Sequence, residues 1–105
     1  MAHVVVDAEN VRRSMWPNLS KDELVERARA WAEREGLSLL IVFDGPAPAE
    51  AEDLLGSDGR SADDVIAELE GPFVLVTSDR ELRERVGSRA ERTIGGGSFL
   101  RGLGV

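Results

Sequence analysis

The chain has 105 residues, a length that suits one compact domain, and 42 % of them are apolar, so we expect a hydrophobic core. The absence of cysteine excludes disulfides, thiolate metal sites and cysteine nucleophiles. No segment approaches the roughly 20 apolar residues that cross a bilayer, and no basic region precedes the first apolar run. We therefore expect a cytoplasmic protein with neither a signal peptide nor a membrane span.

The net charge of −7 is unevenly distributed along the chain. Residues 44–70 contain nine acidic residues and one base, whereas residues 79–105 contain four acidic residues and six arginines. This asymmetry is typical of an acidic metal site beside a phosphate-binding surface, although solvated helix faces produce the same pattern.

The first predicted elements are a strand, a loop and a helix. Residues 3–7 are rich in β-branched side chains and predict a strand, and residues 8–19 predict a loop. Ser20 and Glu23 form a capping box at the start of a helix, and Gly36 is suited to end it.

The middle of the chain repeats this pattern. Residues 38–44 predict a second strand, residues 45–60 a loop, and Ser61 the start of a second helix. A third strand is predicted at residues 72–78. All three strands are continuously apolar rather than alternating, as expected for parallel strands covered on both faces.

A third helix and a short edge strand complete the predicted fold. Ser78 and Glu81 form a capping box for a helix that ends at Gly87, and residues 91–94 predict the strand. The alternation of strands and helices predicts a single α/β domain over residues 1–105. Its open parallel sheet has about four strands, with helices on both faces.

Residues 95–105 form a glycine-rich tail that contains Phe99 and Leu100. Two large apolar side chains after three glycines can reach a surface groove, while the glycines keep the link flexible. We expect the tail to pack back on the domain or to form a subunit contact, which leaves a homodimer open.

Three aspartates follow the predicted strands: Asp7, Asp44 and Asp79. The carboxyl ends of parallel strands lie on one edge of a sheet, so these side chains are expected to converge. Packed like charges are costly unless a cation neutralises them, and oxygen ligands favour Mg²⁺ or Mn²⁺. A turn at Asp44 and helix capping at Asp79 are the structural alternatives.

The helix that begins at Ser61 offers two further acidic candidates. Its buried stripe centres near Ala62 and Leu69, and at 100° per residue Asp63 lies about 110° from that centre and Asp64 about 150°. Asp63 therefore flanks the buried face and can lean over the sheet edge, so we predict it as the fourth acid. Asp64 is better placed to close the helix cap.

Two neutral polar residues accompany these acids. Asn10, three residues after Asp7, is placed to orient a water molecule or a phosphate, or else to cap a loop. Ser78 precedes Asp79 and is placed to contact the substrate, although helix capping explains it equally.

Four arginines and one tryptophan are candidates for substrate binding near the same edge. Arg12, Arg13, Arg80 and Arg83 are placed to hold flanking phosphates. Trp16 in the predicted first loop can stack on an unpaired base, which favours single-stranded RNA, or can anchor the loop on the core.

Four segments together resemble the motifs of the NYN domain, and most closely its YacP-like branch within the PIN-like nuclease superfamily. They are Val-Val-Asp-Ala-Glu-Asn at 5–10, Val-Phe-Asp at 42–44, Ser-Ala-Asp-Asp-Val-Ile at 61–66 and Val-Thr-Ser-Asp at 76–79. The resemblance spans residues 3 to about 100. Each motif alone is weak, but four in the right order are fairly specific.

The resemblance implies a Rossmann-like sheet in spatial order 2-1-3-4 and hydrolysis of RNA that depends on Mg²⁺ or Mn²⁺. Carried over by motif, Asp7, Asp44, Asp63 and Asp79 form the acidic centre, and Asn10 is its polar companion. The sequence is therefore interpreted as a small metal-dependent ribonuclease.

Two other interpretations remain. One is a catalytically silent RNA-binding or protein-interaction module with the same fold. The other is a receiver-like domain phosphorylated on a strand-end aspartate, with Asp7, Asp44 and Thr77 in its site. That chemistry also requires a lysine after the last strand, and the only lysine, Lys21, stands at the start of the first predicted helix.

Overall fold

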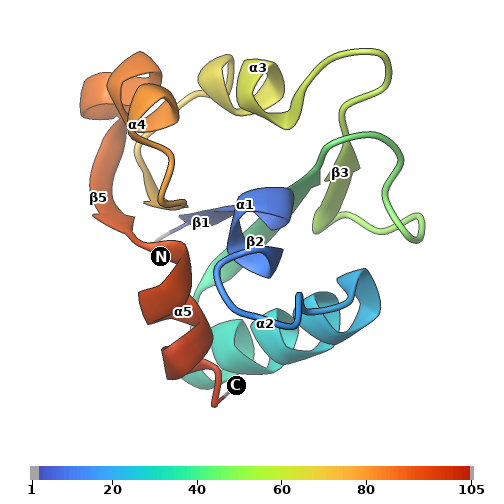
Figure 1. The fold of residues 1–105 in the computed structure, drawn as a ribbon. Coiled ribbons are helices and arrows are strands. Elements are labelled where there is room, and N and C mark those ends of the chain that lie inside the picture. The colour runs from blue at the N-terminus through green and yellow to red at the C-terminus, as the bar shows by residue number, and fades with distance from the viewer. Residues whose placement is uncertain (1–2, 105) are drawn as a thin grey trace.

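A computed structural model describes residues 3–104 and contains a five-stranded sheet in which every strand pair is parallel (Figure 1). The order across the sheet is β3-β2-β1-β4-β5. The strands are β1 (His3–Asp7), β2 (Ser38–Phe43), β3 (Leu54–Gly56), β4 (Phe73–Val76) and β5 (Ala90–Ile94).

The predicted α/β class and the order of the four predicted strands are confirmed, and the sheet has five strands where about four were predicted. The additional strand, β3, lies inside the predicted loop 45–60 and pairs with β2 through Leu54 opposite Ile41. Three residues are too few to show a strand period, and Gly56 weakens the pattern further. Only the edge of β2 makes this segment a strand.

Helices cover both faces of the sheet, as predicted. α1 (Ala8–Arg12), α2 (Lys21–Glu35) and α5 (Gly96–Gly102) pack on one face, and α3 (Ala62–Ala67) and α4 (Arg80–Val86) on the other. Alternate residues of β1 divide between the two cores, with Val4 and Val6 facing α1, α2 and α5 and Val5 facing α3 and α4. Both cores therefore meet at the central strand.

The long helix α2 begins and ends where the sequence predicts. The Ser20 hydroxyl accepts a hydrogen bond of 3.1 Å from the Glu23 amide, which caps its first turn. Gly36 adopts a left-handed conformation with φ of 68°, and the Leu37 amide donates to the Ala32 carbonyl at 2.9 Å. This glycine-terminated motif satisfies the last carbonyl groups of the helix.

The predicted loop 8–19 is wrong in its first half, where the chain forms α1. Ala8 and Val11 are buried on this helix, which follows β1 without an intervening loop. Five residues are too short for helical periodicity to be recognised, and isolated helices of this length are unstable. Packing against the core thus decides the conformation.

The glycine-rich tail contains a helix that the sequence does not predict, since residues 96–102 form α5. The prediction that Phe99 and Leu100 pack back is confirmed, since both are buried, and Phe99 meets Trp31 edge-on with ring centroids 5.1 Å apart. Gly96 allows the close approach to α1, because a Cβ there would overlap the Ser14 hydroxyl. The domain itself therefore covers Phe99 and Leu100.

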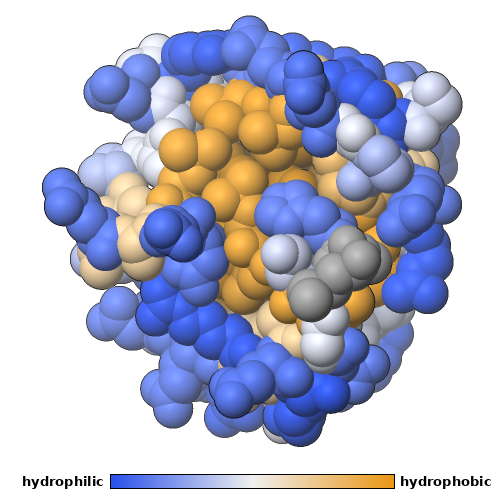
Figure 2. All heavy atoms as spheres, turned by 180° about the vertical axis from the view of Figure 1, so that it is seen from behind, coloured by the Kyte–Doolittle hydropathy of each residue, from blue (hydrophilic) through white to orange (hydrophobic). Residues whose placement is uncertain are grey.

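One surface of the molecule exposes apolar groups. Seen from behind, these groups occupy the middle of the surface, and hydrophilic residues surround them (Figure 2). A hollow of about 390 Å³, lined by Leu37, Val74, Glu91 and Arg92, lies near the N-terminal ends of the strands.

No helix within residues 3–104 is both long and apolar enough to cross a membrane.

Candidate active site

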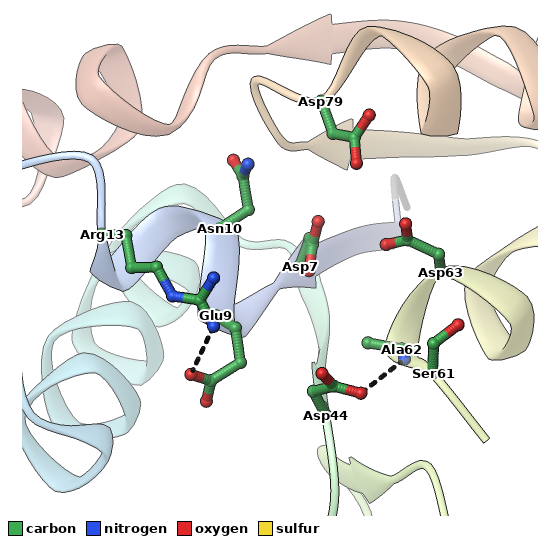
Figure 3. Close-up of a pocket in the computed structure, with 9 residues that line it drawn as sticks. All are labelled: Asp7, Glu9, Asn10, Arg13, Asp44, Ser61, Ala62, Asp63 and Asp79. Carbon is green, nitrogen blue, oxygen red and sulfur yellow. Dashed lines mark hydrogen bonds and ion pairs between the residues drawn. The ribbon is translucent and has the colours of Figure 1, made fainter.

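An acidic pocket of about 200 Å³ lies at the carboxyl ends of the strands (Figure 3). Five of its lining residues are acidic, and they come from β1, α1, α3 and the segments that follow β2 and β4. The pocket is lined by Asp7, Glu9, Asn10, Arg13, Asp44, Ser61, Ala62, Asp63 and Asp79. Asp7, Asp44, Asp63 and Asp79, which were expected to converge, therefore all line one pocket.

Asp7 is the last residue of β1 and is only 4 % exposed. Burial raises the pKa of its carboxyl from 3.8 to about 6; the Thr77 hydroxyl, which donates to Oδ2 at 2.9 Å, lowers it, and the charges of Asp63 and Asp79 raise it. Asp7 is thus a buried carboxylate whose negative charge is costly without a cation.

Asp79 is held in place by the start of α4. Its Oδ1 accepts from the Leu82 amide at 3.3 Å, and its own amide donates to the Thr77 hydroxyl at 3.1 Å. The predicted capping box of Ser78 and Glu81 is therefore wrong, and Asp79 caps the helix. The Ser78 hydroxyl instead accepts from the Gly96 amide at 2.8 Å. Thr77 links Asp7 to Asp79.

The helical phase separates Asp63 from Asp64 as predicted. Asp63 faces the pocket, and its pKa is raised by burial and by the charge of Asp79 (Figure 3). Asp64 pairs with Arg85 at 3.1 Å on the surface, which lowers its pKa. Its backbone amide donates to the Ser61 hydroxyl and closes the α3 cap.

Asp44 and Asn10 both have structural contacts in the pocket. Asp44 is exposed, and its Oδ1 accepts from the Ala62 amide at 3.3 Å, which ties β2 to the start of α3 (Figure 3). The Asn10 side-chain oxygen accepts from the Ser78 amide at 2.8 Å, which ties α1 to the segment before α4. Each residue thus joins two elements that border the pocket.

The four predicted arginines divide into two groups. Arg12 donates to Glu9 and to the Leu19 carbonyl, and Arg83 donates to the Thr77 carbonyl at 2.8 Å, so both hold the fold together. Arg13 lines the pocket with its side chain 66 % exposed, and Arg80 is exposed at the start of α4. Arg13 and Arg80 are the two that remain open to a ligand.

Sequence reasoning did not include Glu9 in this site, and it named Thr77 only in the receiver-like interpretation. Glu9 lines the pocket and balances its charge by pairing with Arg12 at 2.7 Å and Arg13 at 3.7 Å. Its position follows only if residues 8–12 are helical, which the sequence does not show. Thr77 has a weak sequence signal, a hydroxyl two residues before Asp79.

The donor atoms of the pocket suit a hard divalent cation. All side-chain donors are carboxylate, amide or hydroxyl oxygens, the ligand types preferred by Mg²⁺ and Mn²⁺. The raised pKa of Asp7 reflects first its burial and then the charges of Asp63 and Asp79, and a bound cation would offset both. Within residues 3–104, however, no three histidine or acidic side chains stand close enough together to hold one ion. The residues fit a cation chemically but do not form a ready-made ligand cage.

Comparison with known proteins supports the fold. No family model matches the chain, and no curated protein sequence matches it. The chain is similar to a crystal structure of Rae1 (YacP) from Bacillus subtilis, with a TM-score of 0.78 and 18 % identity over 99 % of this chain and 76 % of that one. At this identity the likeness shows the fold alone: the chain has a PIN-like fold, as its motifs predict.

Proposed function

We propose that this protein is a metal-dependent ribonuclease that hydrolyses phosphodiester bonds of RNA at the acidic pocket. The observation that carries the proposal is the convergence of Asp7, Asp44, Asp63 and Asp79 from four separate segments on one pocket. The likeness in fold to YacP and the four NYN-like motifs support the same assignment. Asp44 and Asp79 also have structural contacts, but four carboxylates that line one pocket repel one another unless a cation is present.

Mg²⁺ or Mn²⁺ is the proposed cofactor, with Asp7, Asp63 and Asp79 as its main ligands and Asp44 close by. When bound, such an ion acidifies a water molecule and offsets the negative charge that develops on the phosphate. Because the carboxylates do not form a closed cage, we expect water to complete the coordination and the affinity to be modest.

The protein's own groups have distinct tasks in this proposal. Thr77 holds the Asp7 carboxylate, and the α4 cap holds Asp79, so neither has to be ordered when substrate binds. Asn10 fixes the Ser78 segment beside them. Arg13 at the rim is placed to contact a phosphate of the RNA, and Glu9 keeps its guanidinium close to the pocket.

A silent RNA-binding module with the same fold is the second candidate. It is favoured by the spacing of the carboxylates, which leaves no ready-made ligand cage within the described residues. This candidate retains RNA binding through the exposed Arg13 and Arg80 but performs no cleavage.

Cleavage of labelled single-stranded RNA with Mn²⁺, Mg²⁺ or EDTA tests the proposal. We expect cleavage by the wild type only with the divalent ion and loss of cleavage in Asp7→Asn and Asp79→Asn. Asp64→Asn is the control, because it removes an acid of α3 that is adjacent to Asp63 but lies outside the pocket. It should retain nearly full activity.

Thermal melts with increasing Mn²⁺ separate the two candidates. A ribonuclease should be stabilised by Mn²⁺, and Asp7→Asn should reduce this shift. Undiminished cleavage by Asp7→Asn would refute the site. No cleavage by the wild type, together with no Mn²⁺-induced shift, would favour the silent module.

A further inference from the structure

Trp16 is the one large hydrophobic side chain that stands fully exposed within residues 3–104, with 88 % of its surface accessible. It lies in the loop of residues 13–20, between α1 and α2. Single exposed apolar side chains are common on protein surfaces, so exposure alone assigns Trp16 no role. The indole does, however, offer a large flat face with a polar edge for a contact, and its surroundings indicate which contact this is.

The loop does not use Trp16 as its anchor. Arg12 Nε donates to the Leu19 carbonyl at 2.7 Å, and the Leu19 amide donates to the Arg12 carbonyl at 3.2 Å, which closes the base of the loop. Leu19 is buried, and Met15 packs against the core. The base of the loop is thus fixed by other residues, and the indole projects outward from a tethered backbone.

The position of Trp16 relative to the acidic pocket indicates the class of ligand. Arg13, which lines that pocket, precedes Trp16 by three residues, so their Cα atoms are separated by at most about 11 Å. This separation is short enough for a strand whose phosphate contacts Arg13 to place a neighbouring base on the exposed indole. The short distance couples a cationic contact to an aromatic one.

The surrounding charge supports a polyanionic strand on this side of the pocket. On the face of the sheet that α1 and α5 cover, Arg13 and Arg101 are exposed. Glu9 of α1 also lies on this side, and its charge is balanced by Arg12 and Arg13. The opposite wall, formed by α3, contributes acids. Phosphates are attracted to the side on which α1 and the loop lie and repelled from the other.

We propose that Trp16 is a stacking platform for one unpaired base of the RNA strand that the acidic pocket holds. This inference rests on the proposed function, because that function puts the scissile phosphate at the acidic pocket. An indole stacks on any base, so the contact selects single-stranded over duplex RNA without selecting a sequence. Bases in a duplex are already stacked and paired, and their faces are inaccessible.

RNA binding in EDTA tests stacking independently of cleavage. The probes are a fluorescein-labelled octauridylate, an abasic ribose-phosphate octamer of the same charge, and a duplex RNA of eight base pairs. We expect octauridylate to bind more tightly than the abasic octamer and the duplex. Trp16→Ala should weaken octauridylate binding about five- to 100-fold and leave abasic binding unchanged.

Two further variants sharpen the test. Trp16→Phe should retain most of the affinity, because the phenyl ring also stacks. In Trp31→Phe, Trp16 is the only indole left, and its emission should be quenched by octauridylate but not by the abasic octamer. Thermal melts check that this second substitution, next to Phe99, leaves the protein folded; if it unfolds, the Trp16→Ala comparison decides alone.

Specific outcomes overturn the inference. Equal binding of octauridylate and the abasic octamer, or unchanged affinity in Trp16→Ala, would remove the stacking role while metal-dependent cleavage could still stand. Conversely, base-dependent quenching without any cleavage would leave the platform in place and refute the ribonuclease. A blue shift of Trp16 emission that depends on protein concentration without RNA would assign the indole to a contact between copies and overturn the inference.

Discussion

Asp7 is buried, and its negative charge therefore lowers the stability of the folded protein. Its pKa rises from 3.8 to about 6 on folding. Between these two values the folded state binds more protons than the unfolded state, so the stability contributed by this group falls as pH rises through the window. Above pH 6 the cost is complete, at about 3 kcal/mol.

Asp7→Asn should therefore stabilise the metal-free protein at pH 7. The amide oxygen can still accept the Thr77 hydrogen bond, while the buried charge and its repulsion from Asp63 and Asp79 are removed. We expect a gain of about 1–3 kcal/mol in free energy of unfolding at pH 7 that disappears near pH 4. Urea unfolding in EDTA at several pH values measures this difference, and a gap that does not change with pH would contradict it.

Thr77 is the second residue whose substitution has a defined outcome. Its buried hydroxyl donates to Asp7 and accepts from the Asp79 amide. Thr77→Val keeps the shape but leaves both partners unsatisfied, so we expect a loss of about 1–3 kcal/mol and a further rise in the pKa of Asp7. Thr77→Ser retains the hydroxyl and should preserve both properties. NMR titration of the Asp7 carboxyl carbon would decide, and an unchanged pKa in Thr77→Val would show that the hydroxyl does not stabilise the ionised form.

Among the elements, α5 shows how a glycine-rich segment becomes a helix. Glycine disfavours helices by about 1 kcal/mol relative to alanine, and α5 has three of them. Burial of Phe99 and Leu100 offsets this cost, and Gly96 permits the contact with Ser14 and Val11 of the α1 region. The close approach of the two segments is thus the condition for the helix.

Gly96→Ala should separate α5 from α1, because the new Cβ overlaps the Ser14 hydroxyl and lies 3.3 Å from Val11 Cα. We expect destabilisation of about 1–3 kcal/mol, partly reversed by adding Ser14→Ala. Gly97→Ala is the matched control, because its Cβ meets only Arg101 Nη1 at 3.7 Å, and it should stabilise the protein by about 0.4–1 kcal/mol. Equal effects of the two alanines in thermal melts would argue against the tight contact.

At the scale of the whole molecule, an acidic protein is proposed to bind a polyanion through a small local surface. The net charge of −7 opposes RNA, and only Arg13 and Arg80 of the four predicted arginines are open to a ligand. Few phosphates can therefore be neutralised. Specific contacts such as the Trp16 stack become more important than long-range attraction.

The salt dependence of RNA binding should accordingly be shallow. For two or three phosphates held, the logarithm of the binding constant should fall with the logarithm of salt concentration with a slope of about −1.4 to −2.1. Arg13→Gln should reduce this slope by about 0.7, whereas Arg27→Gln, whose exposed partner is Glu23 on α2, should leave it unchanged. A much steeper wild-type slope would indicate a larger basic surface than the one described.

Segments with a repeated pattern were predictable, and short segments were not. The strand β1 was recognisable from its run of β-branched residues, and the helix α2 from its capping box and its terminal glycine. β3 and α1 have three and five residues, and they form only because a neighbouring strand or core is present. Asp79 caps α4 in place of Ser78, because the Ser78 hydroxyl accepts a hydrogen bond from the Gly96 amide, far along the chain.

The α/β class, and the edge at which Asp7, Asp44 and Asp79 gather, follow from the sequence alone, because continuous apolar runs mark the strand ends and parallel strands share an edge. Helical phase also distinguishes Asp63 from Asp64. Three properties could not be predicted in this way: the burial of Asp7 against Thr77, the choice of arginines that the fold engages, and the exposure of Trp16. Those properties depend on contacts between residues far apart in the chain, such as the 70 positions between Asp7 and Thr77, and no local pattern encodes them.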